Sequence, residues 1–391
     1  MTSLLVLLDL SAAFDTVDHN LLIENLYCYC VRNGALLLLK SYLSDRSQRV
    51  VVGNTISDPL LCGVPQGSVL GPVLFTVYTS SLSFLLDAHG VAHHLYADDT
   101  QLYVKIENIN ETKMQMESLL LDVNLWMLKR KLKLKDNKTE IIIIRGNRRI
   151  NYLENDLSLN IGGHQLDSVS TVRNLGVHFN SKLNYEENIK QVVKVCNFHI
   201  RNLYSVRRFL NKRCLLSLIH SAILSRVDYC NVLWVGLPNY LLKKVQTILN
   251  RTARLIFNLP PGTPTTPYLI ELHWLPIKAR IEFKLCLLIF KALKFGEPDY
   301  LADLLRSPAA HSGAIRRSND DALRLEEPVA VHQSSFANRS FSHVAPELYN
   351  KLPLSMRQFD SVELFKKQLK TQLFTKSYDL VRGSVTEIYQ L

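Results

Sequence analysis

The sequence predicts an α+β fold in which helices back a small antiparallel sheet and a mainly helical region follows. Three observations support this class. Residues 4–8 form a continuous apolar run, which is typical of a strand buried on both faces. Residues 91–95 and 101–104 are strand-like runs joined by an acidic turn, the pattern of a hairpin. Beyond about residue 185, apolar residues recur at the spacing of amphipathic helices.

The first part of the chain alternates strands and helices. Its first strand ends in Asp9, and ligand sites favour such strand ends. In chain order we expect a strand at 4–8, a helix at 21–43 with a break at Asn33-Gly34, and a strand at 49–52. A second helix opens from the Gly- and Pro-rich loop at 63–72 and runs to about 86. The hairpin, a helix at 110–133 and a strand at 139–145 follow. This order predicts an α+β sandwich with helices on one face of the sheet.

The second part is predominantly helical. A polar, Asn-rich connector at 147–160 and short strands at 159–161 and 172–179 precede it. A Pro- and Gly-rich break at 260–264 divides it, and residues 307–340 are polar and irregular. The helices are expected at 187–210, 213–229, 241–259, 279–295 and 361–378.

The composition is that of a folded, basic protein. The chain has 391 residues, of which 47% are hydrophobic and 21% charged, so it is too apolar for a disordered protein. Because this length exceeds the size at which a single core stops growing, we expect two or three subdomains. The formal net charge is +11, which predicts a polyanionic partner, either nucleic acid or an anionic membrane surface. Nucleic acid is the preferred interpretation.

The cysteine pattern and the apolar runs predict an intracellular, non-membrane protein. Seven cysteines are scattered without a CxxC pair, which is typical of reduced thiols. The apolar runs are much shorter than the roughly 20 residues that a membrane span needs. Asp9 interrupts the N-terminal apolar run and no basic segment precedes it, so a signal peptide is not expected. The expected location is the cytoplasm or the nucleus.

Three carboxylates carry the sharpest indication of chemistry. Asp9 ends the first strand, and Asp98 and Asp99 lie in the hairpin turn. Carboxylates on adjacent strand ends repel one another unless a hard cation neutralises them, and Mg²⁺ is held by a few carboxylates together with substrate phosphates. Two such ions, roughly 3.5 to 4 Å apart, support the in-line displacement of polymerase chemistry. The alternative is structural, because Asp is common in turns and helix caps.

Three motifs stand in a fixed order around these carboxylates. They are LDLSAAFD at 8–15, GVPQGSVLGP at 63–72 and YADD at 96–99. They resemble the A, B and C motifs of reverse transcriptases, in the form typical of LINE-type (non-LTR) retrotransposons. Residues 132–140 resemble the D motif that follows, and residues 173–177 resemble the E motif near the primer grip. So long an ordered series makes the resemblance specific.

The resemblance implies a right-hand polymerase palm that performs RNA-directed DNA synthesis. On this basis Asp9 and Asp98 are the metal-binding carboxylates, and Asp99 beside them is a supporting ligand. The expected cofactor is Mg²⁺, with Mn²⁺ as the alternative. The expected partners are an RNA template, a DNA primer and deoxynucleoside triphosphates. The sequence leaves the oligomeric state open.

The resemblance also assigns residues around the incoming nucleotide. Phe14 matches the aromatic steric gate under the sugar, whereas without the resemblance it is an ordinary core residue. Gln66 and Gly67 match the loop that contacts the nucleotide and the template, where glycine otherwise marks a turn. Lys138 is a candidate to meet the triphosphate, and its alternative is a solvated surface lysine.

A basic stripe follows the helix predicted at 187–210. It consists of Lys190, Lys194, Arg201 and Arg208. The resemblance implies that this helix belongs to a thumb whose cations contact the phosphates of a template and primer duplex, while the alternative is a solvated helix face. The predicted domains are a reverse transcriptase palm at 1–150, a connector and primer-grip region at 151–184, a helical thumb at 185–260 and a C-terminal extension at 261–391.

The chain departs from the family at its start. It begins eight residues before Asp9, whereas a fingers subdomain and an endonuclease lie upstream in full-length relatives. We therefore expect an N-terminally truncated element. The first hypothesis is an RNA-directed DNA polymerase, and the second is a catalytically inactive nucleic-acid-binding remnant. A structural remnant without a nucleic-acid role is disfavoured by the net charge of +11.

Overall fold

The computed structural model describes residues 2–47, 49–59, 61–135, 138–145, 157–161, 164–305, 324–327 and 337–379. It divides the chain into two compact units, Met1–Lys182 and Leu183–Leu391, and each is described by itself. This division is coarser than the four predicted domains, whose internal boundaries stay a prediction. Residues 136–137 of the predicted D motif, and most of the irregular stretch at 307–340, lie outside the described residues.

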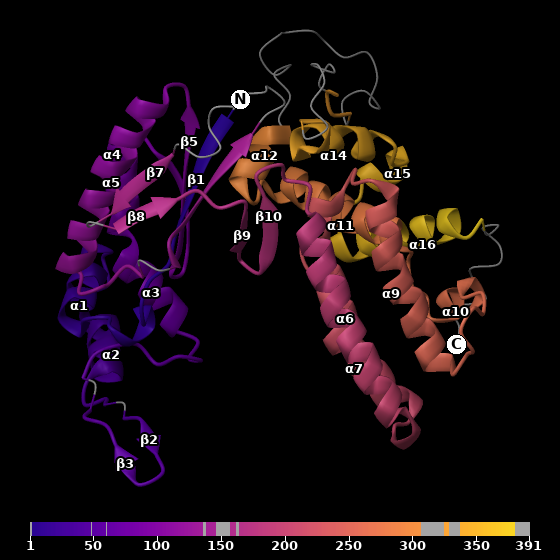
Figure 1. The fold of residues 1–391 in the computed structure, drawn as a ribbon, viewed down its shortest axis with the longest axis horizontal. Helices are drawn as coiled ribbons and strands as arrows, with labels where there is room; N and C mark the ends of the chain where they lie inside the picture. The colour runs from indigo at the N-terminus through magenta and orange to yellow at the C-terminus, as the bar shows by residue number, and fades with distance from the viewer. Residues whose placement is uncertain are drawn as a thin grey trace. The chain divides into compact units, whose positions relative to one another are not determined.

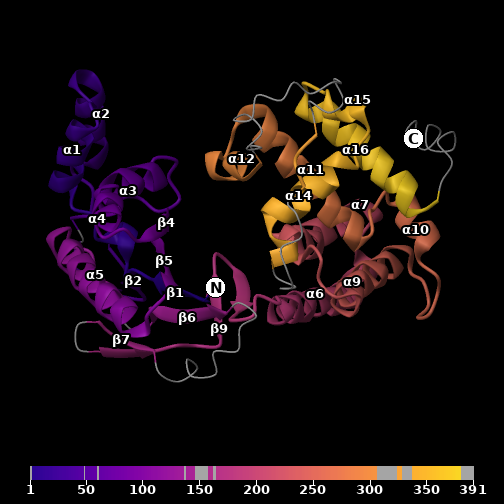
Figure 2. The ribbon, with the colours of Figure 1, turned by 90° about the horizontal axis from the view of Figure 1, so that it is seen from above.

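The first unit is built on a four-stranded antiparallel sheet, whose strands β1 and β5 are labelled in Figure 1. Its strands are β4 (Ala92–Tyr96), β5 (Asp99–Ile106), β1 (Thr2–Leu8) and β6 (Glu140–Arg145), in that spatial order (Figure 2). The central strand β1 pairs with β5 on one side and with β6 on the other, so that Leu5 lies opposite both Tyr103 and Ile142. The antiparallel sheet confirms the predicted fold class.

Both faces of β1 are covered, as its continuous apolar run predicts. Leu4, Val6 and Leu8 belong to a core shared with five helices. Those helices are α1 (His19–Cys28), α2 (Asn33–Leu43), α3 (Gly71–Thr79), α4 (Ser81–Ala88) and α5 (Ile109–Lys129). On the opposite face, Leu5 and Leu7 pack with Ile142 of β6 and with Val172 of β9 (Thr171–Asn174), which pairs with β10 (Val177–Asn180).

Shorter elements complete the first unit. The strand expected at 49–52 is reduced to β2 (Val51–Val52), which forms a small ribbon with β3 (Thr55–Ile56). A second ribbon, β7 (Ser158–Ile161) with β8 (His164–Asp167), adds Leu159 to the helical core. The helix expected at 110–133 ends earlier, at Lys129, because Lys131 adopts a left-handed conformation and Leu132 N donates to Met127 O.

The second unit is helical and holds two cores. One lies among α6 (Glu186–Val206), α7 (Lys212–Ile219), α8 (Ser225–Asp228) and α9 (Asn239–Phe257), and includes Ile200, Trp234 and Leu249. The other surrounds α11 (Ile277–Phe295), which lies against α14 (Phe341–Asn350) and α16 (Val362–Ser377) (Figure 2). Among the helices that the structure describes, none is long and apolar enough to cross a membrane.

The remaining helical elements of the second unit are short. A π-helical turn at His220–Leu224 interrupts the helix expected at 213–229. The sequence patterns did not predict α14, where Pro346 lies inside the helix. The other short elements are η3 (Arg207–Phe209), η5 (Asn231–Trp234), α10 (Thr266–Glu271), α12 (Asp299–Leu305), η7 (Ala337–Arg339) and α15 (Leu354–Arg357).

Asp18 gives the first unit a pH-dependent contact. Its Oδ1 accepts a hydrogen bond of 3.0 Å from Leu21 N and caps α1, and its Oδ2 accepts one from the Lys131 ammonium. The bond from Lys131 and those from the helix backbone outweigh the effect of burial and lower the pKa of Asp18 below its ordinary value of 3.8.

We predict that Asp18→Asn destabilises the protein at neutral pH and less so in acid. Because the folded-state pKa is lowered, the contribution of the charge is present above the unfolded value of 3.8 and disappears as the pH falls through the folded value. Asn keeps the cap, so only the charge is removed. Urea unfolding from pH 7 to pH 2 measures the effect. A difference between parent and variant that does not shrink toward low pH would contradict this assignment.

Candidate active site

The pairing of β1 with β5 sets the position of the acidic residues. Leu8 lies opposite Thr100 in the antiparallel register, so the next position along each strand places Asp9 beside Asp99. The backbone of Asp9 is held from the other side, because its carbonyl accepts a hydrogen bond of 2.9 Å from Lys135 N. Asp9 therefore has a fixed position at the end of the central strand β1.

The hairpin turn carries backbone strain next to the acids. Tyr96 pairs with Asp99, so Ala97 and Asp98 are the two turn residues, and Ala97 has a φ of 53°. Ala12, shortly after Asp9, is also left-handed, with a φ of 47°. This conformation costs a residue with a Cβ atom roughly 1–2 kcal/mol. Such strain clusters at functional sites, where the surrounding packing holds it.

Asp9 and Asp99 line a common cavity of about 460 Å³. Lys138 also lines it, and its Nζ lies 3.4 Å from Asp9 Oδ2. Partial burial, followed by the charges of Asp98 and Asp9, raises the pKa of Asp99 above its ordinary value. Glu140 and Arg173 line the cavity as well, so three carboxylates share it with two cations.

The far wall of the cavity comes from β9. Arg173 and Asn174 line it, and Gln101 Nε2 of β5 donates a hydrogen bond of 3.2 Å to Asn174 Oδ1. Sequence reasoning placed both residues in the predicted E motif but did not name them as site residues. The motif itself was the available signal, whereas their proximity to Asp9 depends on the packing of β9 and β10 under the sheet.

The other predicted nucleotide-binding residues do not line this cavity. Phe14 is half-buried and stacks on Phe75 of α3, with ring centroids 4.6 Å apart. Gln66 Nε2 donates a hydrogen bond of 3.2 Å to Asp15 Oδ1, which ties the loop of the second motif to the first motif. Gly67 has a φ of 82°, which explains the glycine at this position. The structure brings Asp9, Asp99 and Lys138 together, whereas Asp98 contributes charge from the turn.

Gly63 fixes the approach of the second motif to the first. A Cβ atom at this position would lie 2.9 Å from the Asp15 backbone, and the φ of Gly63 is 95°. Gly63 N donates to Val17 O, and Val64 N donates to Phe14 O, both at 2.8 Å. The close backbone contact therefore requires glycine and joins two motifs that are far apart in the sequence.

The predicted basic stripe lies in the second unit. Lys190, Lys194 and Arg201 are exposed on α6, and the Arg208 guanidinium lies 4.7 Å from the centre of the Phe209 ring. Lys190 Nζ is 3.3 Å from Glu187 Oε2. Arg207, which directly precedes Arg208, instead donates to the carbonyls of Leu255 and Ile256. The stripe is thus a solvent-facing surface distinct from the arginines that hold the helices together.

The acidic residues suit a cation that also binds substrate. The described part of the chain holds no group of three or more His, Cys, Asp or Glu side chains placed to bind a metal by themselves. Mg²⁺ is usually held by one or two carboxylates plus phosphate oxygens and water. Asp9 and Asp99 supply carboxylates of the kind that this donor set needs, and Glu140 also lines their cavity. The charges of Asp98 and Asp9 contribute to the raised pKa of Asp99.

Comparison with known proteins shows which family the first unit resembles. Residues 2–179 match the family model of reverse transcriptase (RNA-dependent DNA polymerase). The probable RNA-directed DNA polymerase from transposon BS of Drosophila melanogaster is 29% identical over 221 residues, which cover 54% of this chain and 24% of that protein. The RNA-directed DNA polymerase from the mobile element jockey of the same species is 24% identical over 265 residues, or 65% of this chain and 28% of that protein.

The chain thus spans about a quarter of the length of these relatives. A structural match to telomerase from Candida albicans, solved in complex with a fragment of telomeric RNA, covers 69% of this chain and 49% of the telomerase chain. Its TM-score is 0.31 and the sequence identity is 12%. The family match and the two relatives show that this chain carries a reverse transcriptase domain of the LINE type, over residues 2–179.

Proposed function

We propose that the chain is an RNA-directed DNA polymerase that extends a primer by nucleotidyl transfer at Asp9 and Asp99. The observation that carries this proposal is the antiparallel register of β1 and β5, which brings the two carboxylates into one cavity. This proposal exchanges the roles that the sequence analysis gave to Asp98 and Asp99, because Asp99 lines the cavity and Asp98 does not. Asp98 would support the site from the turn. The names of the two relatives, both RNA-directed DNA polymerases, support the same activity. The proposed substrates are an RNA template, a DNA primer and deoxynucleoside triphosphates.

Asp9 and Asp99 are the residues that would hold Mg²⁺, or Mn²⁺ in its place. Such an ion, when bound, neutralises phosphate charge and activates the primer 3′-hydroxyl. Lys138 could exchange its contact with Asp9 for a triphosphate oxygen, because it lines the cavity and its side chain is more than half exposed. Its charge then stabilises the phosphates during transfer.

The remaining predicted residues position the substrates. Phe14, held against Phe75, would lie under the sugar of the nucleotide and disfavour a 2′-hydroxyl. Gln66 and Gly67 would contact the nucleotide and the template strand from a loop anchored at Asp15. Lys190, Lys194, Arg201 and Arg208 would contact the phosphates of the duplex, which position it without reading its sequence.

One observation favours the second candidate, a nucleic-acid-binding protein without turnover. The Lys138 ammonium already lies 3.4 Å from Asp9 Oδ2, so a protein cation occupies part of the place that a metal would take. In that case the basic stripe would still bind a duplex, and the carboxylates would be dispensable for binding. The two candidates therefore differ in whether Asp99 is needed for a chemical step.

We predict that Asp99→Asn lowers primer extension on an RNA template by about 100-fold or more, because a metal ion supplies several kcal/mol of charge stabilisation in the transition state. The measurement is gel-resolved primer extension with Mg²⁺, on protein shown to be folded by circular dichroism. Asp87→Asn is the matched control, since Asp87 is exposed at the end of α4 and lies outside the cavity lining.

The possible outcomes separate the two candidates. Extension by the parent and the Asp87→Asn control, with none by Asp99→Asn, supports the polymerase. Folded parent that shifts a primer–template duplex in a gel without extending it supports the binding protein. Equal extension by the parent and by Asp99→Asn would rule out the proposed role of this carboxylate.

We also predict that Lys194→Ala with Arg201→Ala weakens binding to a primer–template duplex and reduces its salt dependence. Each lost phosphate contact lowers the slope of log K against log salt concentration by about 0.9 in magnitude, so the double variant loses about 2. Fluorescence anisotropy over roughly 50 to 300 mM salt measures the slope. Lys351→Ala is the control, because the Lys351 ammonium pairs with Glu347 on α14. An unchanged slope in the double variant would exclude this surface.

A further inference from the structure

The exposed face of α6 carries aromatic side chains between its basic ones. Along α6 and the adjoining turn η3, the residues of this face follow one another at intervals of three or four positions, and together they form the α6 surface: Lys190, Lys194, Phe198, Arg201, Tyr204 and Arg208. Residues at this spacing are neighbours on one side of a helix. The aromatic residues therefore belong to the same surface as the cations of the stripe.

The aromatic rings of this surface face solvent and are not packed into the core. The exposed fraction is 51% for Phe198, 46% for Tyr204 and 74% for Phe209, which follows Arg208 in η3. The Phe198 ring meets the His199 ring edge to face, with centroids 5.4 Å apart, and the Arg208 guanidinium lies over the Phe209 ring. Exposed apolar residues scattered singly need no explanation, whereas a group of them on one surface indicates an interaction site.

The charge of this part of the chain has one sign. Residues 188–227 contain eight lysines and arginines and no aspartate or glutamate. The neighbouring helix α9 adds a further cation, because the Arg251 guanidinium donates to Asn197, which lies on α6 between Lys194 and Arg201. A surface with this charge complements a phosphate backbone. Cations that alternate with aromatic rings are typical of surfaces that bind phosphates and bases together.

The aromatic rings distinguish an unpaired strand from a duplex. The bases of a duplex are stacked about 3.4 Å apart, so their faces are closed to a protein ring. An unpaired strand can splay its bases, and each base then stacks on an aromatic side chain while cations contact the phosphates. At about 1.5 Å of rise per residue, Phe198 and Tyr204 lie roughly 9 Å apart along α6. This separation suits an extended strand.

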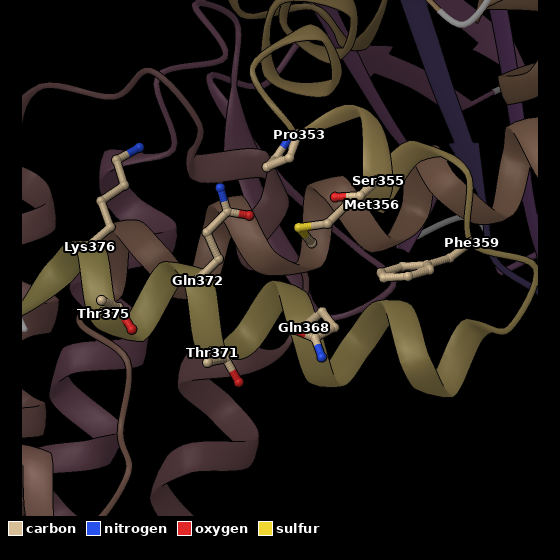
Figure 3. Close-up of a pocket in the computed structure, with 9 residues that line it drawn as sticks. All are labelled: Pro353, Ser355, Met356, Phe359, Gln368, Thr371, Gln372, Thr375 and Lys376. Carbon is tan, nitrogen blue, oxygen red and sulfur yellow. The ribbon is translucent and has the colours of Figure 1, made fainter. Parts of the chain in front are cut away.

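A groove elsewhere in the second unit lacks this combination of residues. It has a volume of about 600 Å³ and lies between α16 and the segment around α15 (Figure 3). Lys376 is the one cation among the described residues that line it, and its ammonium lies 3.8 Å from Glu282 Oε1. Because a phosphate backbone requires several cations, the α6 surface suits nucleic acid better than this groove does.

We infer that the α6 surface binds single-stranded RNA. The bases stack on Phe198 and Tyr204, and Lys194 and Arg201 hold the phosphates. This inference deepens the proposed function and rests on it in one respect, because the unpaired RNA template of the proposed polymerase identifies the strand as RNA. The cations contact the phosphates of a duplex and of a single strand alike, whereas the rings add affinity only for unpaired bases. The surface therefore prefers an unpaired strand to a duplex.

Phe198→Leu with Tyr204→Leu tests the inference, because it removes both rings and keeps apolar side chains at two exposed positions. The probes are a fluorescein-labelled oligouridine RNA of about 12 nucleotides, a typical site size for such surfaces, and a blunt RNA–DNA duplex of the same length. In fluorescence anisotropy, we expect the double variant to bind the single strand about 30-fold or more weakly than the parent, through the loss of two stacked bases. Its affinity for the duplex should stay within about twofold of that of the parent, since the cations are unchanged.

Two further variants control this measurement. Tyr204→Phe with Phe198 unchanged keeps both rings and should bind the single strand as the parent does. Phe295→Leu makes the same kind of substitution at a ring that is 55% exposed on α11, and it should leave both affinities unchanged. Circular dichroism establishes that each variant is folded.

Phe198→Trp reports stacking directly and requires one exposed substitution, so it tests the inference even where the double variant does not fold. A base stacked on the introduced indole quenches its fluorescence. The oligouridine should therefore quench the fluorescence of this variant more than that of the parent, and the duplex should not. Binding of the single strand without this additional quenching overturns the inference.

The remaining outcomes separate this inference from the proposed function. Unchanged single-strand affinity in the folded double variant overturns the inference, as does an equal loss of affinity for the single strand and the duplex, which indicates a structural role for the rings. An oligodeoxythymidine of the same length that binds more tightly than the RNA through the same rings overturns the assignment to RNA. Neither measurement involves primer extension, so a parent that binds RNA through these rings and never extends a primer contradicts the proposed function alone.

Discussion

The pairing of β1 with β5 is the constraint on which the rest of the first unit depends. β1 lies at the centre of the sheet with both faces covered, by the five helices on one side and by Val172 of β9 on the other. A register shift of one residue would turn each apolar side chain of β1 to the opposite face, so the register is strongly specified. The same register places Asp9 beside Asp99. The packing of the core thus determines the geometry of the acidic cavity.

The core also holds an arrangement that is unfavourable by itself. Two alanines near the acids adopt left-handed backbone conformations, and nearby negative charge contributes to the raised pKa of Asp99. Neither feature stabilises the fold. Both are tolerated because β1, β5 and the loop of the second motif are fixed by buried strand pairing and by the close backbone contact of Gly63 with Asp15. Strain and charge repulsion concentrated beside one cavity support its assignment as a reactive site.

The second unit uses its polar residues in two different ways. Arg207 donates to a backbone carbonyl and Arg280 to the Asp228 carboxylate, and these contacts join the helices. Lys194 and Arg201 instead face solvent on α6. The exposed cations of α6 suit the phosphate contacts that the proposed function requires. The unit therefore combines a structural scaffold with a solvent-facing basic surface.

The sequence by itself determined the fold class, most of the helices and strands, and the family, because apolar periodicity and motif order are properties of short segments. It also identified Asp9, Asp98 and Asp99 as a set, although their roles stay predictions. It did not predict α14, in which Pro346 lies inside the helix, or the π-helical turn at His220–Leu224. Only the tertiary structure decided that Lys138 contacts Asp9 and that Arg173 and Asn174 line the cavity. Such contacts join residues distant in the chain, and they depend on strand register and helix packing rather than on local pattern.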